Sequence, residues 1–193
     1  MMFSQVPASA AWRHRDAREG FESVFLRADR PGYRLEGHTA AVEEGQAWAV
    51  RYVIALDEHW TTRTARVWGW SLKGEHEVWL EADGSGRWQV NARAAPELDG
   101  CLDVDLESSA CTNTIPVNRL RLRVGESVEA PAAYVRALDL RVERLEQQYA
   151  RVDDDGTHQR YDYRCPAFDF ECRVVYDDSG LVLEYPGIAL RVL

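Results

Sequence analysis

The stretch DGSGRWQVNARAAPELDGCLDVDLESSACTNTIPVNRLRLRVG, residues 83–125, is the densest run of turn residues, acids, amides and alternating apolar residues in the chain. It opens with Asp83-Gly84-Ser85-Gly86, which predicts a hairpin turn because glycine accepts the positive φ of tight turns. Apolar residues then alternate with acids over 102–107 and with arginines over 119–124. Period two is the spacing of strands, so we predict two amphipathic strands joined by a connector over 108–118. Their charged faces could pair acid against arginine.

Outside this stretch, short alternating segments are separated by turns that contain glycine. The segments predicted as strands include residues 21–28, 33–42, 46–57, 61–72, 75–82, 87–91, 168–176, 181–185 and 188–193. Residues 134–152 are expected to hold one or two strands, with a helix as the alternative over 141–149. Short, evenly spaced strands are typical of an antiparallel meander. We therefore predict a single mainly β domain over residues 1–193, built as a strongly curved sheet or incomplete barrel with one or two short helices.

The N-terminal segment, residues 1–20, carries no clear strand pattern. We expect it to be irregular, with a short helix over 12–19 before Gly20. Its beginning, MMFSQVPASAAW, has neither the basic nor the apolar region of a secretory signal. The four cysteines form no C-x-x-C pair. Together these features predict a cytoplasmic protein with free thiols.

Composition limits the classes of partner. Of 193 residues, 46% are hydrophobic, enough for a sizeable core. Twenty-three basic residues against 32 acidic ones give a net charge of −9. Nucleic acids and anionic membranes select basic patches, so neither is expected as a partner. No apolar run reaches the roughly 18 residues of a membrane-spanning helix. Oligomeric state cannot be read from the sequence.

Several tryptophans are candidates for a ligand site. Trp60, Trp68 and Trp70 share one parity near the predicted strand 61–72, so their indole rings are expected on one surface. Such rings either fill a core or line a cleft that holds an apolar ligand. Trp68 and Trp70, with Trp88 in the following hairpin, are therefore candidate ligand contacts, with core filling as the alternative.

The acids of the opening stretch allow three interpretations. Asp103 and Asp105 could pair with arginines such as Arg119 on solvated faces, where ion pairs are individually weak. Together with Asp99, they could instead line a cavity and accept hydrogen bonds from sugar hydroxyls. A third possibility is glycoside hydrolysis, which needs two carboxyl groups roughly 5–9.5 Å apart, one of them with a raised pKa. Residues i and i+2 of a strand lie near the lower end of that range.

The connector offers one further polar candidate, Asn113. Its side chain could cap local backbone or present an amide to a polar ligand head. The chain has no phosphate-binding loop, serine-hydrolase elbow or zinc-protease motif. Its five histidines have no metal-ligand spacing. We therefore expect neither a cofactor nor a metal ion, although a site assembled from distant residues would leave no such motif.

Five short motifs together resemble a bacterial family described as "putative glycolipid-binding", formerly a domain of unknown function. They are Gly86-Arg87-Trp88, Leu98–Asp105, Thr112–Val117 with Arg119-Leu120, Gly180-Leu181-Val182 and Tyr185-Pro186-Gly187. The resemblance implies a half-open antiparallel barrel like that of periplasmic lipoprotein carriers, in which a curved sheet wraps an apolar cavity. The family's ligand is itself inferred from its fold.

The leading hypothesis is a non-catalytic protein that binds a lipid or glycolipid in an aromatic-lined cavity. The predicted ligand contacts are Trp68, Trp70, Trp88, Asp99, Asp103, Asp105, Asn113 and Arg119. The first alternative is a hydrolase for a glycoside or ester that uses paired aspartates. The second is an interaction module with a fully packed interior, which a cavity smaller than about 300 Å³ would favour.

Overall fold

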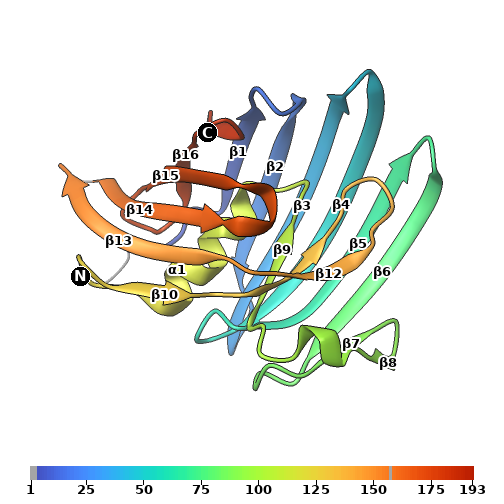
Figure 1. Ribbon diagram of the computed structural model, residues 1–193, viewed down its shortest axis with the longest axis horizontal. Coiled ribbons are helices and arrows are strands. Elements are labelled where there is room, and N and C mark those ends of the chain that lie inside the picture. Colours follow the sequence, from blue (N-terminus) through green and yellow to red (C-terminus); the bar gives the residue numbers. More distant parts are fainter. Residues whose placement is uncertain (1–3, 157) are drawn as a thin grey trace.

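The computed structural model describes residues 4–156 and 158–193, and a single large antiparallel sheet dominates it (Figure 1). The strands follow one another across this fourteen-stranded sheet as β10 (Ser127–Glu129), β13 (Gln148–Asp155), β14 (His158–Cys165), β15 (Phe170–Tyr176), β16 (Val182–Tyr185), β17 (Ala189–Arg191), β1 (Ser9–His14), β2 (Glu19–Ala28), β3 (Gly32–Glu43), β4 (Gln46–Asp57), β5 (Thr62–Ser71), β6 (Gly74–Ala82), β7 (Trp88–Val90) and β8 (Arg93–Ala94). The sheet curves strongly without closing into a barrel. The predicted mainly β class is confirmed.

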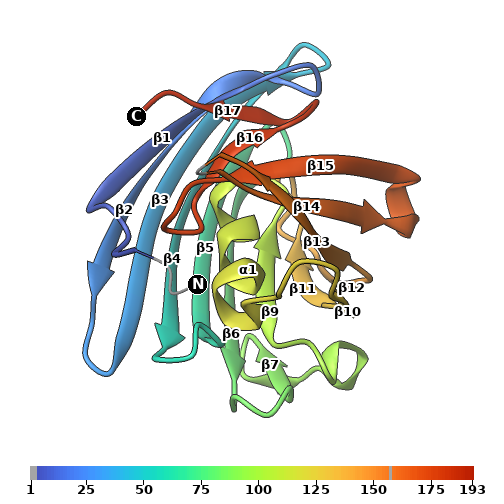
Figure 2. The same ribbon diagram turned by 90° about the vertical axis from the view of Figure 1, so that its left-hand side faces the viewer.

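A smaller layer occupies the hollow of the curved sheet (Figure 2). It consists of a three-stranded sheet and one helix. The sheet has the strand order β12 (Val142–Leu145), β11 (Ala132–Val135) and β9 (Asp103–Leu106), and the helix is α1 (Thr114–Leu120), which comes after β9 in the chain. β9 and β11 run parallel, unlike the pairs of the large sheet. Residues 4–156 and 158–193 also contain three short 3-10 helices: η1 (Pro96–Leu98), η2 (Cys111–Asn113) and η3 (Pro166–Phe168). Within the described residues, no helix has both the length and the apolar character needed to cross a bilayer.

Strand β4 illustrates how the sequence builds the large sheet. Its predicted bounds, residues 46–57, are those observed. The residues of one parity, Trp48, Val50, Tyr52, Ile54 and Leu56, are all buried, because they face the hollow. Those of the other parity are half-buried or exposed on the outer face. The period-two alternation therefore places the core on one face of the strand.

Close packing inside the hollow depends on Gly37 of β3. A Cβ atom added there would lie 2.0 Å from Cζ of Tyr52, which pairs with Gly37 across β3 and β4. The Tyr52 ring therefore lies over the glycine, and its hydroxyl donates a 2.6 Å hydrogen bond to Glu22 of β2. The Glu22 carboxyl also accepts hydrogen bonds from the backbone N–H groups of Ala110 (2.8 Å) and Cys111 (3.2 Å). This cluster ties the connector after β9 to the sheet.

The N-terminal expectation was wrong for residues 9–14 and for the short helix over 12–19, whereas residues 1–3 lie outside the described part of the chain. Residues 9–14 form β1, which pairs with β2 on one side and with β17 on the other. Ala10, Trp12 and His14 are buried at period two, so the alternation of a strand is present. The charged run after Trp12 hides it, because Arg13 lies on the solvent side and His14, a polar residue, lies in the core.

The predicted strand over residues 119–124 was also wrong. Arg119 and Leu120 form the end of α1, and Arg121 adopts the left-handed conformation (φ 48°) that terminates the helix. Pro116 fits within the first turn of this helix, where its missing N–H costs no hydrogen bond. Over six residues, alternation does not separate a strand from one helical turn followed by a loop.

Candidate functional site

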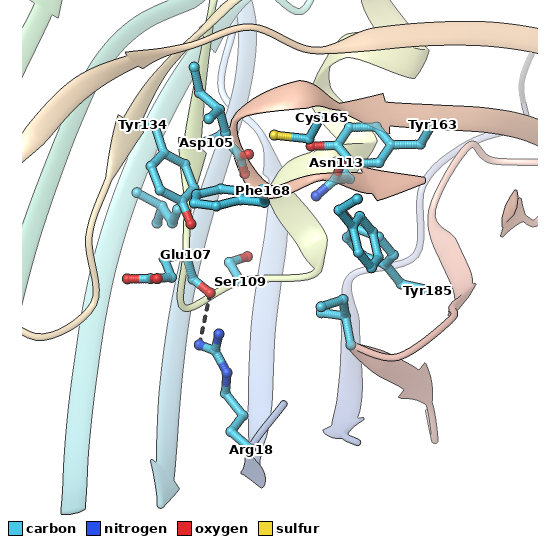
Figure 3. Close-up of a pocket in the computed structure, with 14 residues that line it drawn as sticks. Arg18, Asp105, Glu107, Ser109, Asn113, Tyr134, Tyr163, Cys165, Phe168 and Tyr185 are labelled. Carbon is cyan, nitrogen blue, oxygen red and sulfur yellow. Dashed lines mark hydrogen bonds between the residues drawn. The ribbon is translucent and has the colours of Figure 1, made fainter. Parts of the chain in front are cut away.

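A pocket of about 210 Å³ opens between the small inner layer and the C-terminal part of the large sheet (Figure 3). Its lining comes from segments far apart in the chain: the turn before β2, the end of β9 and its connector, β11, β12, β14, η3, β15 and the strand pair β16–β17. Most lining residues are apolar or aromatic: Leu106, Tyr134, Leu145, Tyr163, Cys165, Phe168, Phe170, Tyr185 and Ile188. The polar ones are Arg18, Asp105, Glu107, Ser109 and Asn113.

The aromatic rings form two contacting groups. Tyr163, Phe170 and Tyr185 meet with centroid separations between 5.8 and 6.3 Å. Tyr134 and Phe168 meet at 5.8 Å. Their tilted and edge-on contacts are the arrangements that aromatic pairs favour. Ring faces and edges that remain open toward the pocket give it walls suited to an apolar group.

Arg136 lies beside two aromatic side chains that line the pocket, Tyr134 and Phe168. Its guanidinium lies 5.2 Å from the centroid of the Tyr134 ring and 5.1 Å from that of Phe168. It also forms ion pairs with Glu107 (3.2 Å) and Glu143 (2.8 Å). These contacts fix Phe168, although 44% of this side chain is exposed. Tyr134 and Phe168 are therefore held by cation–π contacts as well as by packing against each other.

Asp105 and Asn113 both lie in this pocket, and both already have protein partners. The Asp105 carboxyl accepts hydrogen bonds from Thr112 Oγ1 (2.7 Å) and Gln147 Nε2 (2.5 Å). Burial raises its pKa, and these hydrogen bonds oppose the rise. Asn113 Oδ1 accepts a 2.8 Å hydrogen bond from the hydroxyl of Tyr149. The two residues thus help to build the pocket, and their role as ligand contacts stays a prediction.

Asp103 and Arg119 form an ion pair outside the pocket lining. Arg119 Nε and Nη2 donate to the two carboxylate oxygens of Asp103 at 2.8 and 2.6 Å. Burial raises the pKa of Asp103, and Arg119 opposes the rise. The acid–arginine pairing foreseen from the sequence is present, but it joins a strand to a helix and is buried instead of solvated. The pair docks α1 against β9.

The tryptophans do not share one cavity. Trp68 lies on the outer face of the large sheet between the guanidinium groups of Arg51 and Arg66, each 4.9 Å from its ring. Trp70 has the same parity and is exposed. Trp60 belongs to a turn with φ 65° and is buried against Tyr33, so the parity of β5 does not extend to it.

The remaining two predicted contacts also lie away from the pocket. Trp88 is buried, and its Nε1 donates a 2.8 Å hydrogen bond to the carbonyl of Cys101. Asp99 is exposed beside η1, and its carbonyl accepts a hydrogen bond from Arg144. Neither side chain is among those that line the aromatic pocket.

The paired-aspartate hydrolase is not supported. Two carboxyl groups that act on one bond must both reach it. Asp105 borders the pocket, whereas Asp103 is occupied by Arg119 and Asp99 is exposed elsewhere. Among the described residues, no three His, Cys, Asp or Glu side chains are grouped as a metal site. None of the four cysteines forms a disulfide, as the sequence predicts.

Sequence reasoning missed the residues that make most of the pocket. Arg18 stood in a segment expected to be irregular with a short helix, and Tyr134 stood in a predicted strand with no motif. Tyr185 belonged to the motif Tyr185-Pro186-Gly187 but was not chosen as a ligand contact. Tyr161 and Tyr163 are both buried on one face of β14. The sequence carries no sign that this face meets the connector after β9, because the contact runs from Tyr163 to Tyr149 and from the Tyr149 hydroxyl to Asn113, which lies 36 positions earlier in the chain.

The comparison with sequence models of protein families identifies a family for this chain. A sequence model described as "Putative glycolipid-binding" matches residues 9–191. The crystal structure of a DUF1089-family protein from Pseudomonas aeruginosa matches with 31% identity and a TM-score of 0.80 over 100% of both chains. A beta-barrel-like protein of the DUF1849 family from Brucella abortus shares the fold alone, with 11% identity and a TM-score of 0.54 over 98% of this chain and 95% of that one. Among curated proteins there is no match.

Proposed function

The chain belongs to the family described as "Putative glycolipid-binding", and from that membership we propose that its aromatic pocket binds the apolar part of an amphiphilic lipid without catalysis. One observation carries the proposal. A concave site lined mainly by tyrosine, phenylalanine and aliphatic side chains lies between two layers of the fold. Burying an alkyl group against such walls is favourable by about 25 cal/mol per Å² of apolar surface.

The pocket volume limits how much of a lipid it encloses. At about 210 Å³ it lies below the range of roughly 300–1,000 Å³ typical of sites that enclose a whole small molecule. The pocket is therefore too small to enclose a whole lipid. Within our proposal, the pocket holds a short alkyl segment and leaves the rest of the ligand outside. Asp105 and Asn113 are proposed to contact it, whereas Trp68, Trp70, Trp88, Asp99, Asp103 and Arg119 are not.

Native mass spectrometry and titration calorimetry with octyl glucoside below its micelle concentration test the proposal. We expect one bound molecule per chain. Ile188→Trp places an indole at a half-buried lining position and should weaken binding at least about tenfold, because it fills the volume that the octyl chain needs. Val124→Trp makes the same type of change in an exposed turn and should leave binding unchanged.

Two outcomes would count against this function. The first is a wild-type protein that takes up neither octyl glucoside nor any other octyl amphiphile. The second is an Ile188→Trp variant that folds and binds as tightly as wild type, since the alkyl chain would then lie elsewhere. The cytoplasmic location expected from the sequence stays a prediction.

A further inference from the structure

We propose that Arg18 makes the pocket selective for amphiphiles with an anionic head, either a carboxylate or a phosphate monoester. This inference rests on the proposed function, because it names the head group of the ligand whose alkyl segment occupies the aromatic walls. Figure 3 shows Arg18 at one end of the lining residues, near Glu107 and Ser109, with Tyr163 and Cys165 at the other end. Asp105 and Asn113 lie at that other end too, but both are already hydrogen-bonded to protein, so an amphiphile is oriented with its head toward Arg18.

The guanidinium of Arg18 is buried without a full set of partners. Only 9% of the residue is exposed, and it lines the pocket. Nη1 donates a 2.9 Å hydrogen bond to the carbonyl of Glu107. Nε is buried and has no hydrogen-bond partner. A buried N–H group without an acceptor costs free energy, which an oxygen atom supplied by a ligand would recover.

The charge of Arg18 is only loosely balanced by protein. Its nearest carboxylate, Glu43, lies 3.7 Å from Nε, beyond hydrogen-bond distance, and is one-third exposed. The guanidinium also lies over the ring of Trp48, with its Cζ atom 5.2 Å from the ring centroid. Arginine uses its planar fork to hold carboxylate and phosphate oxygens, often through two hydrogen bonds at once. An anionic head at this end would therefore replace a distant partner by a close one.

The other charged groups of the pocket leave this role to Arg18. The Glu107 carboxylate is bound by Arg136 at 3.2 Å and by the backbone N–H of Ala137 at 2.7 Å. Asp105 is buried, and its carboxyl group already accepts hydrogen bonds from Thr112 and Gln147. Arg18 is the only basic residue among those that line the pocket in the described part of the chain.

Calorimetry with matched eight-carbon probes tests the inference. Octanoate and octyl phosphate carry an anion, whereas octanol and octyl glucoside carry neutral heads. We expect wild-type protein to bind octanoate about tenfold more tightly than octanol, the value of one charge-assisted hydrogen bond. Arg18→Gln should remove this preference while retaining octanol binding. Arg13→Gln removes an exposed arginine of β1 and should keep the preference.

The outcomes separate the head-group inference from the proposed function. Equal affinity for octanoate and octanol in wild type overturns the inference and leaves alkyl binding intact, whereas no binding of any octyl probe overturns both. Acetate or inorganic phosphate bound as tightly as octanoate or octyl phosphate would show that a free anion is the ligand, and would overturn the amphiphile. If Arg18→Gln does not fold, Arg18→Lys provides the test. It retains the charge but loses the fork, so the preference for octyl phosphate and octanoate should fall without vanishing, and an unchanged preference would contradict the inference.

Discussion

Replacing Arg119 by methionine should destabilise the protein far more than removing an exposed arginine of the same geometry. Arg119 holds Asp103 through two hydrogen bonds of 2.8 and 2.6 Å. The side chains are 14% and 2% exposed. Methionine keeps the apolar stem but leaves the Asp103 carboxyl buried without its cation. The cost therefore arises from an uncompensated charge and not from lost packing.

The expected loss is about 3–5 kcal/mol, the usual cost of breaking a buried pair by removing one partner. For a chain of this size that corresponds to a fall in Tm of roughly 6–20 °C. Without Arg119, burial raises the pKa of Asp103 unopposed, whereas an unfolded aspartate titrates near about 3.9. The cost is therefore present at pH 7 and shrinks as the pH falls through the raised folded-state pKa of Asp103.

Urea unfolding followed by tryptophan fluorescence at pH 7 and pH 5 measures this effect. The matched control is Arg173→Met, because Arg173 holds Asp162 through the same pair of nitrogens at 2.7 and 3.1 Å while both side chains are about half exposed. We expect the control to lose no more than about 1 kcal/mol. The double variant Asp103→Leu with Arg119→Met should recover most of the loss, since it removes the buried charge. A single Arg119→Met variant that is no less stable than the Arg173→Met control would refute the docking of α1 through this pair.

Two further predictions concern the hollow of the sheet. Gly37→Ala should destabilise the protein by about 1–3 kcal/mol, measured as a lower Tm. The alanine Cβ would overlap the buried Tyr52 ring, and the hydrogen bond from Tyr52 to Glu22 holds that ring in place. An unchanged Tm would mean that the ring is free to move. Burial, reinforced by the guanidinium of Arg18, lowers the pKa of His14 from 6.5 to about 4. The free energy of unfolding should therefore decline by up to about 3 kcal/mol as the pH falls from 6.5 toward 4. In urea unfolding at pH 7 and pH 5, His14→Phe should show a smaller decline than wild type. An equal decline in the variant would assign it to another group.

The strands were predictable wherever one face of the sheet is buried and the other is open. In β4 the alternation is complete, and both ends were located from residues alone. The same rule fails for β9, where all four residues, Asp103 to Leu106, are buried although their pattern is that of a half-exposed strand. The alternation of apolar and acidic residues indicates their polarity and not their exposure. A strand with buried acids is therefore predicted to be a surface strand. The acids are recognised as buried only when their partners are known, and those partners come from α1, the connector and the segment before β13.

The pocket was less accessible to sequence reasoning than the sheet. Its walls combine Arg18, near the N-terminus, with Tyr134 and with Tyr163 and Tyr185 near the C-terminus, and the order of strands brings them together. β17 pairs with β1, so the C-terminal strands lie beside the N-terminal ones. Nothing local to any of these residues encodes that pairing. For Trp68 and Trp70, the local pattern did predict that the two side chains share a surface. It did not predict whether that surface is the inner or the outer face of the sheet.

Residues 83–125 contain many polar side chains, and the clearest role of these side chains is to hold the inner layer within the hollow of the large sheet. Asp103 binds Arg119 of α1, and Asp105 binds Thr112 of η2. Glu22, from β2, binds the backbone of the same connector. Glu22 thus joins the segment to the large sheet, whereas Asp103 and Asp105 hold α1 and the connector to β9. Each of these buried carboxyl groups would be costly to leave unpaired. It follows that substitutions among these acids should alter stability first, whereas substitutions among the tyrosines and phenylalanines of the pocket should alter ligand affinity first. The acid-rich stretch therefore shows how the inner layer is held in place.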